Sequence, residues 1–249
     1  MLLSHPTGNY RFLQGIDPYS CGVIADPGYE IVHVTLEQPL AWRQGFERIE
    51  AHLRDQGRKR SALCGAELRS PAPFTMQGFI DFNRTYCQVL QSWDLYVGEL
   101  NPVARTNVAP AQNPPETPSL HGFSYTVPTP DETPPTLVIA GAGELREGIL
   151  EEERIILSGD TAQDAMFQKA AYVMDVMEER LRGLGGNWGL ISAVDVYTVY
   201  LYERLLEKAV VARMEKATRH GVRWYPSRPP IVDIDFEMDM RGVRTELIL

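Results

Sequence analysis

Residues 110–135, PAQNPPETPSLHGFSYTVPTPDETPP, divide this sequence into two parts of similar length. They contain eight of the eighteen prolines of the chain. Because proline lacks a backbone N–H and fixes φ, such a run predicts an irregular connection. Within it, only residues 120–127 (LHGFSYTV) predict a strand, placed at a sheet edge. We therefore expect one domain over residues 1–130 and a second over residues 131–249.

The first part alternates between strand and helix patterns. Residues 29–36 (YEIVHVTL) alternate and are rich in β-branched side chains, which predicts a strand. Apolar spacing predicts a helix over 39–56, a strand over 62–68, a helix over 78–93 and a strand near 106–109. Gly57 is well placed to end the first of these helices.

The second part repeats this order of elements. Strands are expected over 136–140, 154–157, 191–201 and 231–236, and helices over 161–184 and 203–220. The longest helix can be capped by Asp160 or Thr161. It carries a stripe that includes Met166, Val173 and Met177, which we interpret as core. Together the two parts predict a duplicated α+β unit.

A short motif supports the duplication. Leu53-Arg54-x-x-Gly57 ends the first expected helix, and Leu181-Arg182-x-x-Gly185 ends the longest one. The same offset of 128 residues aligns the strand at residues 63–69 with the one at residues 191–197. The alternative is two unrelated halves, because chance matches of this length are common.

Composition excludes several classes of protein. The 249 residues carry a net charge of −9, which argues against a general binder of nucleic-acid backbones. No apolar run is long enough to span a bilayer, and the N-terminus lacks the pattern of a signal peptide. Three widely spaced cysteines fit a reducing compartment, so we expect a cytoplasmic protein. The five histidines show no metal-ligand spacing, so no metal or other cofactor is expected.

The densest polar cluster in an apolar setting is Asn101-Pro102-Val103-Ala104-Arg105-Thr106-Asn107-Val108. An arginine that enters a strand between apolar residues either forms a surface ion pair or binds an anion. The planar guanidinium of Arg105 suits a carboxylate, and Thr106 adds a hydroxyl donor.

This run resembles the N-x-P-A-R-[ST] motif of the Rid/YjgF family of reactive imine and enamine deaminases. Further similarities follow in the same order: Pro18-Tyr19-Ser20, Asn83-x-x-Tyr86, Val138-Ile139-Ala140-Gly141, Thr161-Ala162-Gln163 and Tyr197. The resemblance implies an α+β fold of two tandem chorismate-mutase-like, YjgF-type β-β-α-β-α-β domains.

The resemblance also implies roles for the matched residues. The carboxylate-binding arginine of the family falls on Arg105, with Thr106 beside it. Tyr19 and Asn83 fall on positions that line the site. In the second half, Arg228 lies where a further arginine is expected.

The catalytic acid is less well defined by the sequence. The family uses a glutamate late in a V-E-I-E strand, and the matching first-half strand has none. The second half offers Glu237, and Glu144 follows the Gly141 turn. The acids at 233, 235, 237 and 239 are alternatively a solvated sheet face, or paired carboxyls that raise one pKa for acid-base work.

The resemblance implies a cofactor-independent hydrolytic deaminase that releases ammonia from an enamine or imine carboxylate. The double length favours a ring-cleavage dicarboxylate such as 2-aminomuconate, with Arg228 or Arg69 on the second carboxylate. It also implies a homo-oligomer, with a trimer favoured. The alternatives are a non-catalytic module of the same fold that binds small carboxylates, and a purely structural oligomer.

Overall fold

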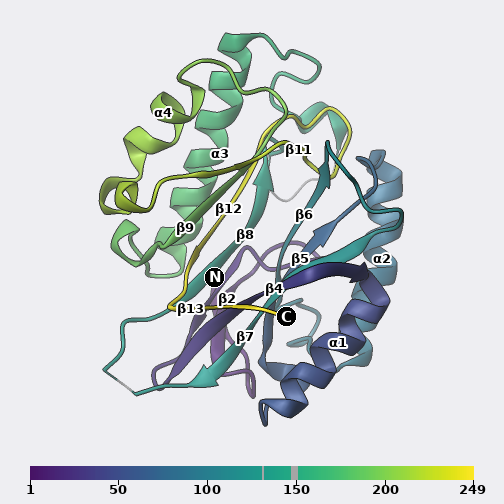
Figure 1. Cartoon of the computed structure of the whole chain (residues 1–249), viewed down its shortest axis with the longest axis vertical. Helices are drawn as coiled ribbons and strands as arrows, with labels where there is room; N and C mark the ends of the chain where they lie inside the picture. Colours follow the sequence, from purple (N-terminus) through teal and green to yellow (C-terminus); the bar gives the residue numbers. More distant parts are fainter. Residues whose placement is uncertain (131, 147–150) are drawn as a thin grey trace.

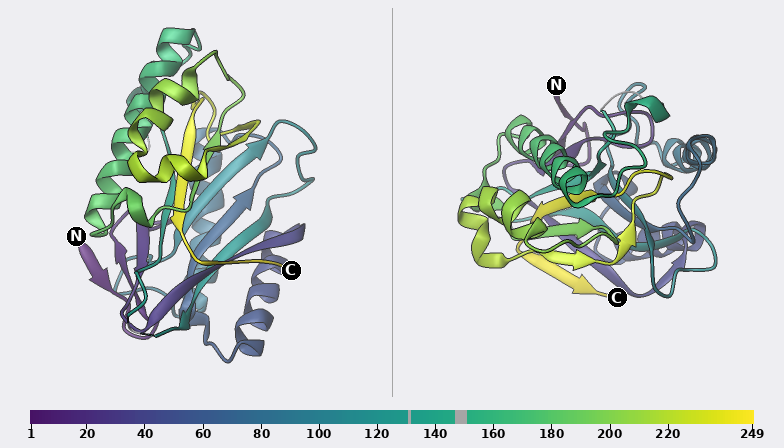
Figure 2. Two further views of the ribbon diagram at one scale, coloured as in Figure 1. Left: turned by 60° about the vertical axis from the view of Figure 1, so that its left-hand side comes forward. Right: turned by 90° about the horizontal axis from the view of Figure 1, so that it is seen from above.

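The computed structural model describes residues 1–130, 132–146 and 151–249. Its described strands form two mixed sheets, which lie between two layers of helices (Figures 1 and 2). The seven-stranded sheet has the order β1 (Leu2–Ser4), β2 (Tyr10–Leu13), β3 (Gly22–Ala25), β8 (Leu137–Gly143), β12 (Glu237–Gly242), β9 (Ala193–Tyr197) and β10 (Arg223–Tyr225). The six-stranded sheet has the order β11 (Ser227–Arg228), β6 (Ala104–Pro110), β5 (Leu63–Arg69), β7 (Ser119–Pro128), β4 (Tyr29–Ala41) and β13 (Thr245–Ile248).

Each sheet carries its own helices on its outer face. Helices α1 (Trp42–Asp55) and α2 (Met76–Ser92) cover the six-stranded sheet, and α3 (Gln163–Gly183) and α4 (Leu205–Ala209) cover the seven-stranded sheet (Figure 1). Phe46, Ile49 and Leu53 of α1 are buried against strands β4, β5 and β7. In the described part of the chain, no helix combines the length and apolar character needed to cross a membrane.

The methionine-rich stripe of α3 belongs to the core, as predicted. Met166, Val173 and Met177 are fully buried and pack in one cluster with residues of β8, β9 and β12. The expected cap by Asp160 or Thr161 is wrong, because the N-cap residue of this helix is Ala162, whose side chain forms no capping hydrogen bond. Oδ1 of Asp160 instead accepts a hydrogen bond from the backbone N–H of Ala162 at 2.9 Å, directly before the helix. The packing follows from the 3.6-residue period of the stripe, which places its members on one face.

The prediction of two tandem chorismate-mutase-like, YjgF-type domains is wrong. Both sheets take strands from both sides of residue 130: β3 pairs with β8 through Val23 and Val138, and β13 runs parallel to β4 through Thr245 and Val32. The edge of a sheet leaves backbone N–H and C=O groups unpaired. Strands β3 and β13 form hydrogen bonds with such groups on β8 and β4, which lie across residue 130 in the sequence. The division of the chain into two domains, residues 1–130 and 131–249, stays a prediction.

The strand connectivity nevertheless repeats within the chain. Strand β5 is parallel to β6 and antiparallel to β7, which in turn pairs with β4. Strand β9 is likewise parallel to β10 and antiparallel to β12, which pairs with β8. The strands aligned by the repeated Leu-Arg-x-x-Gly motif are β5 and β9, so the motif falls on equivalent elements of this connectivity.

Several expected elements differ from the observed ones. The strand expected at a sheet edge over 120–127 is β7, which lies inside its sheet between β5 and β4. Prolines stand only at its ends, so the backbone N–H groups between them can pair with both neighbouring strands. Residues 231–236 form a turn in which Asp233 has φ 70°, so the strand begins only at Glu237. The expected helix over 203–220 is the short α4 followed by 3-10 turns, and residues 154–157 form no strand.

Candidate active site

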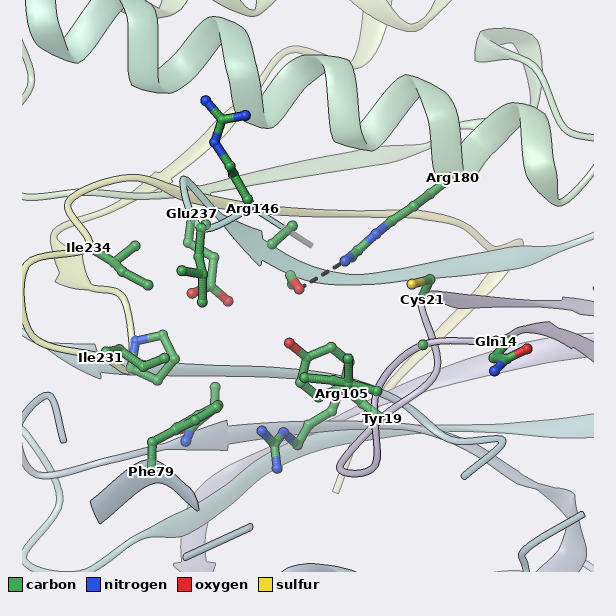
Figure 3. Close-up of a pocket in the computed structure, with 18 residues that line it drawn as sticks. Gln14, Tyr19, Cys21, Phe79, Arg105, Arg146, Arg180, Ile231, Ile234 and Glu237 are labelled. Carbon is green, nitrogen blue, oxygen red and sulfur yellow. Dashed lines mark hydrogen bonds between the residues drawn. The ribbon is translucent and has the colours of Figure 1, made fainter. Parts of the chain in front are cut away.

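A cavity of about 300 Å³ opens where β6, β8 and β12 meet (Figure 3). Its ionisable lining residues are Tyr19, Cys21, Arg105, Arg146, Arg180 and Glu237. Phe79, Ile231 and Ile234 form an apolar part of the wall. A pocket of this size that combines apolar walls with a few convergent charges is typical of a small-molecule site.

Two loops beside this cavity are held in place by hydrogen bonds to the backbone. The backbone N–H of Ser20 donates to the carbonyl of Val103 at 3.0 Å, and its hydroxyl donates to the carbonyl of Pro102. These bonds fix Tyr19 next to the start of β6. On the other side, the N–H of Phe74 donates to the carbonyl of Pro230 at 2.8 Å, which fixes the 230–234 turn beside α2.

Arg105 is a buried cation inside an aromatic cage. The residue is only 3% exposed, and Nη1 donates to Oδ1 of Asn83 at 2.7 Å. The guanidinium lies 4.9 to 5.5 Å from the ring centroids of Tyr19, Tyr86 and Phe79.

No carboxylate among the described residues forms an ion pair with Arg105. A buried charge without a counter-charge is costly, because the interior solvates it poorly. Arginine is also suited to bidentate recognition of carboxylates. The guanidinium of Arg105 can therefore pair with an anionic ligand in the cavity.

Glu237 faces the same cavity from β12 (Figure 3). Burial raises the pKa of its carboxyl well above the usual range, and the charge of Asp239 raises it further. The charges of Arg105 and Arg180 oppose this shift. A carboxyl in this environment can hold a proton at a pH at which exposed carboxyls have lost theirs.

Asp239, two residues further along β12, is buried as well. Its pKa is raised to about 8 by burial and by the charges of Asp195 and Glu67. Tyr197 donates a hydrogen bond to its Oδ2 at 3.0 Å. The alternative of a solvated acidic face is therefore wrong for Glu237 and Asp239, because this face of β12 packs against the other sheet.

Gly141 makes room for the carboxyl group of Glu237. A Cβ at this position would collide with Oε1 of Glu237 and would lie 3.2 Å from Cα of Thr106. Thr106 itself is buried, and it is not among the residues that line the cavity. The absence of a side chain at Gly141 thus lets β6, β8 and the Glu237 carboxyl approach one another.

Glu144 lies behind the wall of the cavity. Its carboxylate accepts hydrogen bonds from the backbone N–H groups of Asp235 at 2.6 Å and Phe236 at 3.0 Å. Nζ of Lys169 lies 3.4 Å from Oε1 of Glu144 and contacts the carboxylate of Asp235. Glu144 therefore holds the backbone directly before Glu237, and burial raises its pKa to about 7.

We expect Lys169→Met to lower the free energy of unfolding by about 2 kcal/mol at pH 8. Removing one partner of a buried ion pair typically costs about 3–5 kcal/mol, but here Glu144 can take up a proton and relieve part of the cost. Since the folded-state pKa of Glu144 is already raised and loss of Lys169 raises it further, the destabilisation grows as pH rises from 5 to 8.

Urea unfolding of the wild type and the variant at pH 5 and pH 8 measures this difference. Lys216→Met, at an exposed position, is the matched control and should change stability little at either pH. Equal stability of the Lys169 and Lys216 variants at pH 8 would show that the buried cluster contributes nothing.

The structure brings some of the predicted residues together and separates others. Arg105, Tyr19 and Glu237 line one cavity, and Asn83 contacts Arg105 from behind. Arg228 is exposed on β11, where it pairs with Ala109 at the far end of β6, so it does not reach the cavity. Arg69 also lies elsewhere, with its guanidinium 5.5 Å from the ring of Tyr197.

Other lining residues were missed by sequence reasoning. Arg180 lies in the last turns of α3 and donates to the carbonyl of Ala140 at 2.8 Å (Figure 3). Arg146 lies at the rim, after β8. Asn107 had a signal, because it follows Arg105 by two residues and therefore lies on the same face of a strand.

Side chains that could ligate a metal do not cluster in the described part of the chain. Within residues 1–130, 132–146 and 151–249, no group of three or more His, Cys, Asp or Glu side chains is arranged to hold a metal ion.

Comparison with solved structures shows the fold. A crystal structure of chorismatase superposes with a TM-score of 0.52 at 14% identity, over 90% of this chain and 77% of that one. A cyanuric acid hydrolase gives a TM-score of 0.43 at 11% identity, over 88% of this chain and 69% of that one. The chorismatase likeness replaces the expected pair of YjgF-type domains.

Comparison of sequences shows the family. Residues 2–247 match the family described as "2-aminomuconate deaminase CnbZ". A relative from Comamonas testosteroni, named 2-amino-5-chloromuconate deaminase, is 39% identical over 244 residues, which are 97% of this chain and 96% of the relative. These matches do not support membership of the Rid/YjgF family. The chain belongs to the CnbZ family of 2-aminomuconate deaminases.

Proposed function

We propose that this protein releases ammonia hydrolytically from 2-aminomuconate or from a chlorinated form of it. Family membership and the name of the 39% identical relative support deamination of a muconate. The observation that carries the proposal is the buried guanidinium of Arg105, which lacks a carboxylate partner among the described residues and shares a cavity with the carboxyl group of Glu237.

The charge of the cavity suits a substrate with two carboxylates. Among the described lining residues, the cationic side chains are Arg105, Arg146 and Arg180, and the side chain with a carboxyl group is Glu237. We assign one substrate carboxylate to Arg105, where Asn83 holds the guanidinium in place. Arg146 at the rim takes the second carboxylate, in place of the expected Arg228 or Arg69.

In the proposed reaction, Glu237 moves the protons. Its protonated carboxyl group gives a proton to the enamine carbon, which produces an iminium ion, and the resulting carboxylate then takes a proton from the water that adds to the iminium carbon. Glu237 returns this proton to the nitrogen, ammonia leaves, and the hydroxyl proton goes back to the carboxylate as the C=O bond forms. One water is consumed and one ammonia is released, and Glu237 ends as it began.

Arg105 supports this chemistry by holding the reacting carbon near Glu237. Bound at the carboxylate next to the amino-bearing carbon, the substrate has little freedom to move away from the proton donor. Phe79, Ile231 and Ile234 cover one side of the cavity with apolar surface. Such a surface limits access of water and strengthens the electrostatic interactions inside.

The test is the stoichiometry of the reaction with 2-aminomuconate. We expect one ammonia and one 2-oxo dicarboxylate for each substrate consumed, well above the rate of spontaneous hydrolysis in a control without protein. If ammonia is not released faster than in the control, while muconate still raises the melting temperature, the non-catalytic carboxylate-binding module is the better account.

A further inference from the structure

Asn107 is a buried amide on the wall of the cavity that the proposed chemistry leaves without a role. It lies on β6 two residues beyond Arg105, so both side chains leave the same face of the strand about 7 Å apart. The residue is only 3% exposed. Both residues are therefore within reach of one small ligand.

The orientation of this amide is set by Ser70. The hydroxyl of Ser70 donates to Oδ1 of Asn107 at 3.0 Å, and the backbone N–H of Ser70 donates to the carbonyl of Val108 at 2.9 Å. Ser70 is thus fixed to β6 itself, and it occupies the acceptor of the Asn107 amide. The donor, Nδ2, is left for another partner.

Nδ2 of Asn107 has no hydrogen-bond acceptor among the described residues, although the atom is buried. Buried polar groups in folded proteins are nearly always paired, because an unpaired one loses its hydration without compensation. A buried donor at the wall of a cavity is therefore suited to an acceptor on a bound ligand.

We infer that Asn107 donates a hydrogen bond to an uncharged oxygen on the carbon beside the ligand carboxylate that Arg105 binds. The site then selects 2-oxo acids and the corresponding hydroxyl-bearing adducts over acids that lack this oxygen. A carboxylate is a weaker candidate for this position, because Arg146 at the rim of the cavity offers a charge for a second carboxylate.

This inference rests on the proposed function and extends it. When water adds to the iminium carbon, the new oxygen appears on the carbon next to the carboxylate. A donor placed there stabilises the adduct and the 2-oxo product and offers nothing to the amino group of the substrate, which is itself a donor. Asn107 thereby lowers the barrier to the addition of water.

Calorimetric binding of two stable six-carbon dicarboxylates tests the inference without turnover. We expect the wild type to bind 2-oxoadipate about tenfold more tightly than adipate, which corresponds to one net hydrogen bond. Asn107→Leu should bind both compounds with the affinity that the wild type has for adipate. Equal affinities of the wild type for the two compounds would overturn the inference.

A double variant keeps the result interpretable. The double variant Ser70→Ala, Asn107→Leu replaces both partners of the hydrogen bond, so no polar atom is stranded if the single variant fails to fold. It should also lose the preference for 2-oxoadipate, and retention of that preference would contradict our assignment. If neither dicarboxylate binds the wild type, the proposed function fails, whereas equal binding of both removes only the role of Asn107.

Discussion

Glu237→Gln is expected to lower kcat for ammonia release by about 10²–10⁴-fold, the range typical of a lost general acid or base. Glutamine keeps the size of the side chain but neither gives nor takes the proton that each step needs. Because Arg105 still binds the carboxylate, KM should change little. The measurement is the initial rate of ammonia release over a range of 2-aminomuconate concentrations.

Glu99→Gln, at an exposed position outside the cavity, is the matched control and should keep the wild-type rate. The pH profile gives a second check, since the pKa of Glu237 is raised and the group acts first as a proton donor. Wild-type activity should therefore fall as pH rises through that raised pKa. A Glu237→Gln variant with wild-type kcat would remove Glu237 from the chemistry.

Arg105→Met is expected to lower kcat/KM by more than about a hundredfold, or roughly 3 kcal/mol of transition-state binding. Methionine removes the charge and the planar fork but leaves an unbranched side chain among Tyr19, Phe79 and Tyr86. The effect should be seen both in KM and in kcat, because the lost contact also places the reacting carbon near Glu237. Initial rates with 2-aminomuconate measure it.

Two arginine variants make this result specific. Arg105→Lys keeps the charge without the bidentate fork and should recover only part of the loss. Arg228→Met removes an exposed arginine of β11 and should leave kcat/KM unchanged. An effect of Arg228→Met as large as that of Arg105→Met would move the carboxylate site away from the cavity described above.

Local patterns in the sequence were enough to predict several elements. Strand β4, helices α1, α2 and α3, and strand β5 each carry an apolar period long enough to identify. Strands β1, β2 and β3 contain three or four residues each, too few for a pattern. Their partners lie far away in the chain, as Val23 and Val138 show, so the composition of the sheets was not readable locally.

The candidate site could be predicted only in part, because it too is formed by residues that lie far apart in the chain. Arg105 stood out because a charged residue interrupts an apolar run. Glu237 was ambiguous, since the same alternation describes a solvated face and a buried one, and only the packing of β12 against the other sheet decides between them. Arg180 had no signal, because an arginine near the end of α3 is ordinary on a helix surface. The trimer and the cytoplasmic location stay predictions.

The most direct test of the central claim is a crystal structure of the protein with bound cis,cis-muconate, a stable dicarboxylate that lacks the amino group. We expect one carboxylate to contact the guanidinium of Arg105 and the carbon chain to extend past the carboxyl group of Glu237. Muconate bound elsewhere, for example beside Arg69 and His121, with the cavity at Arg105 occupied only by solvent, would contradict the account.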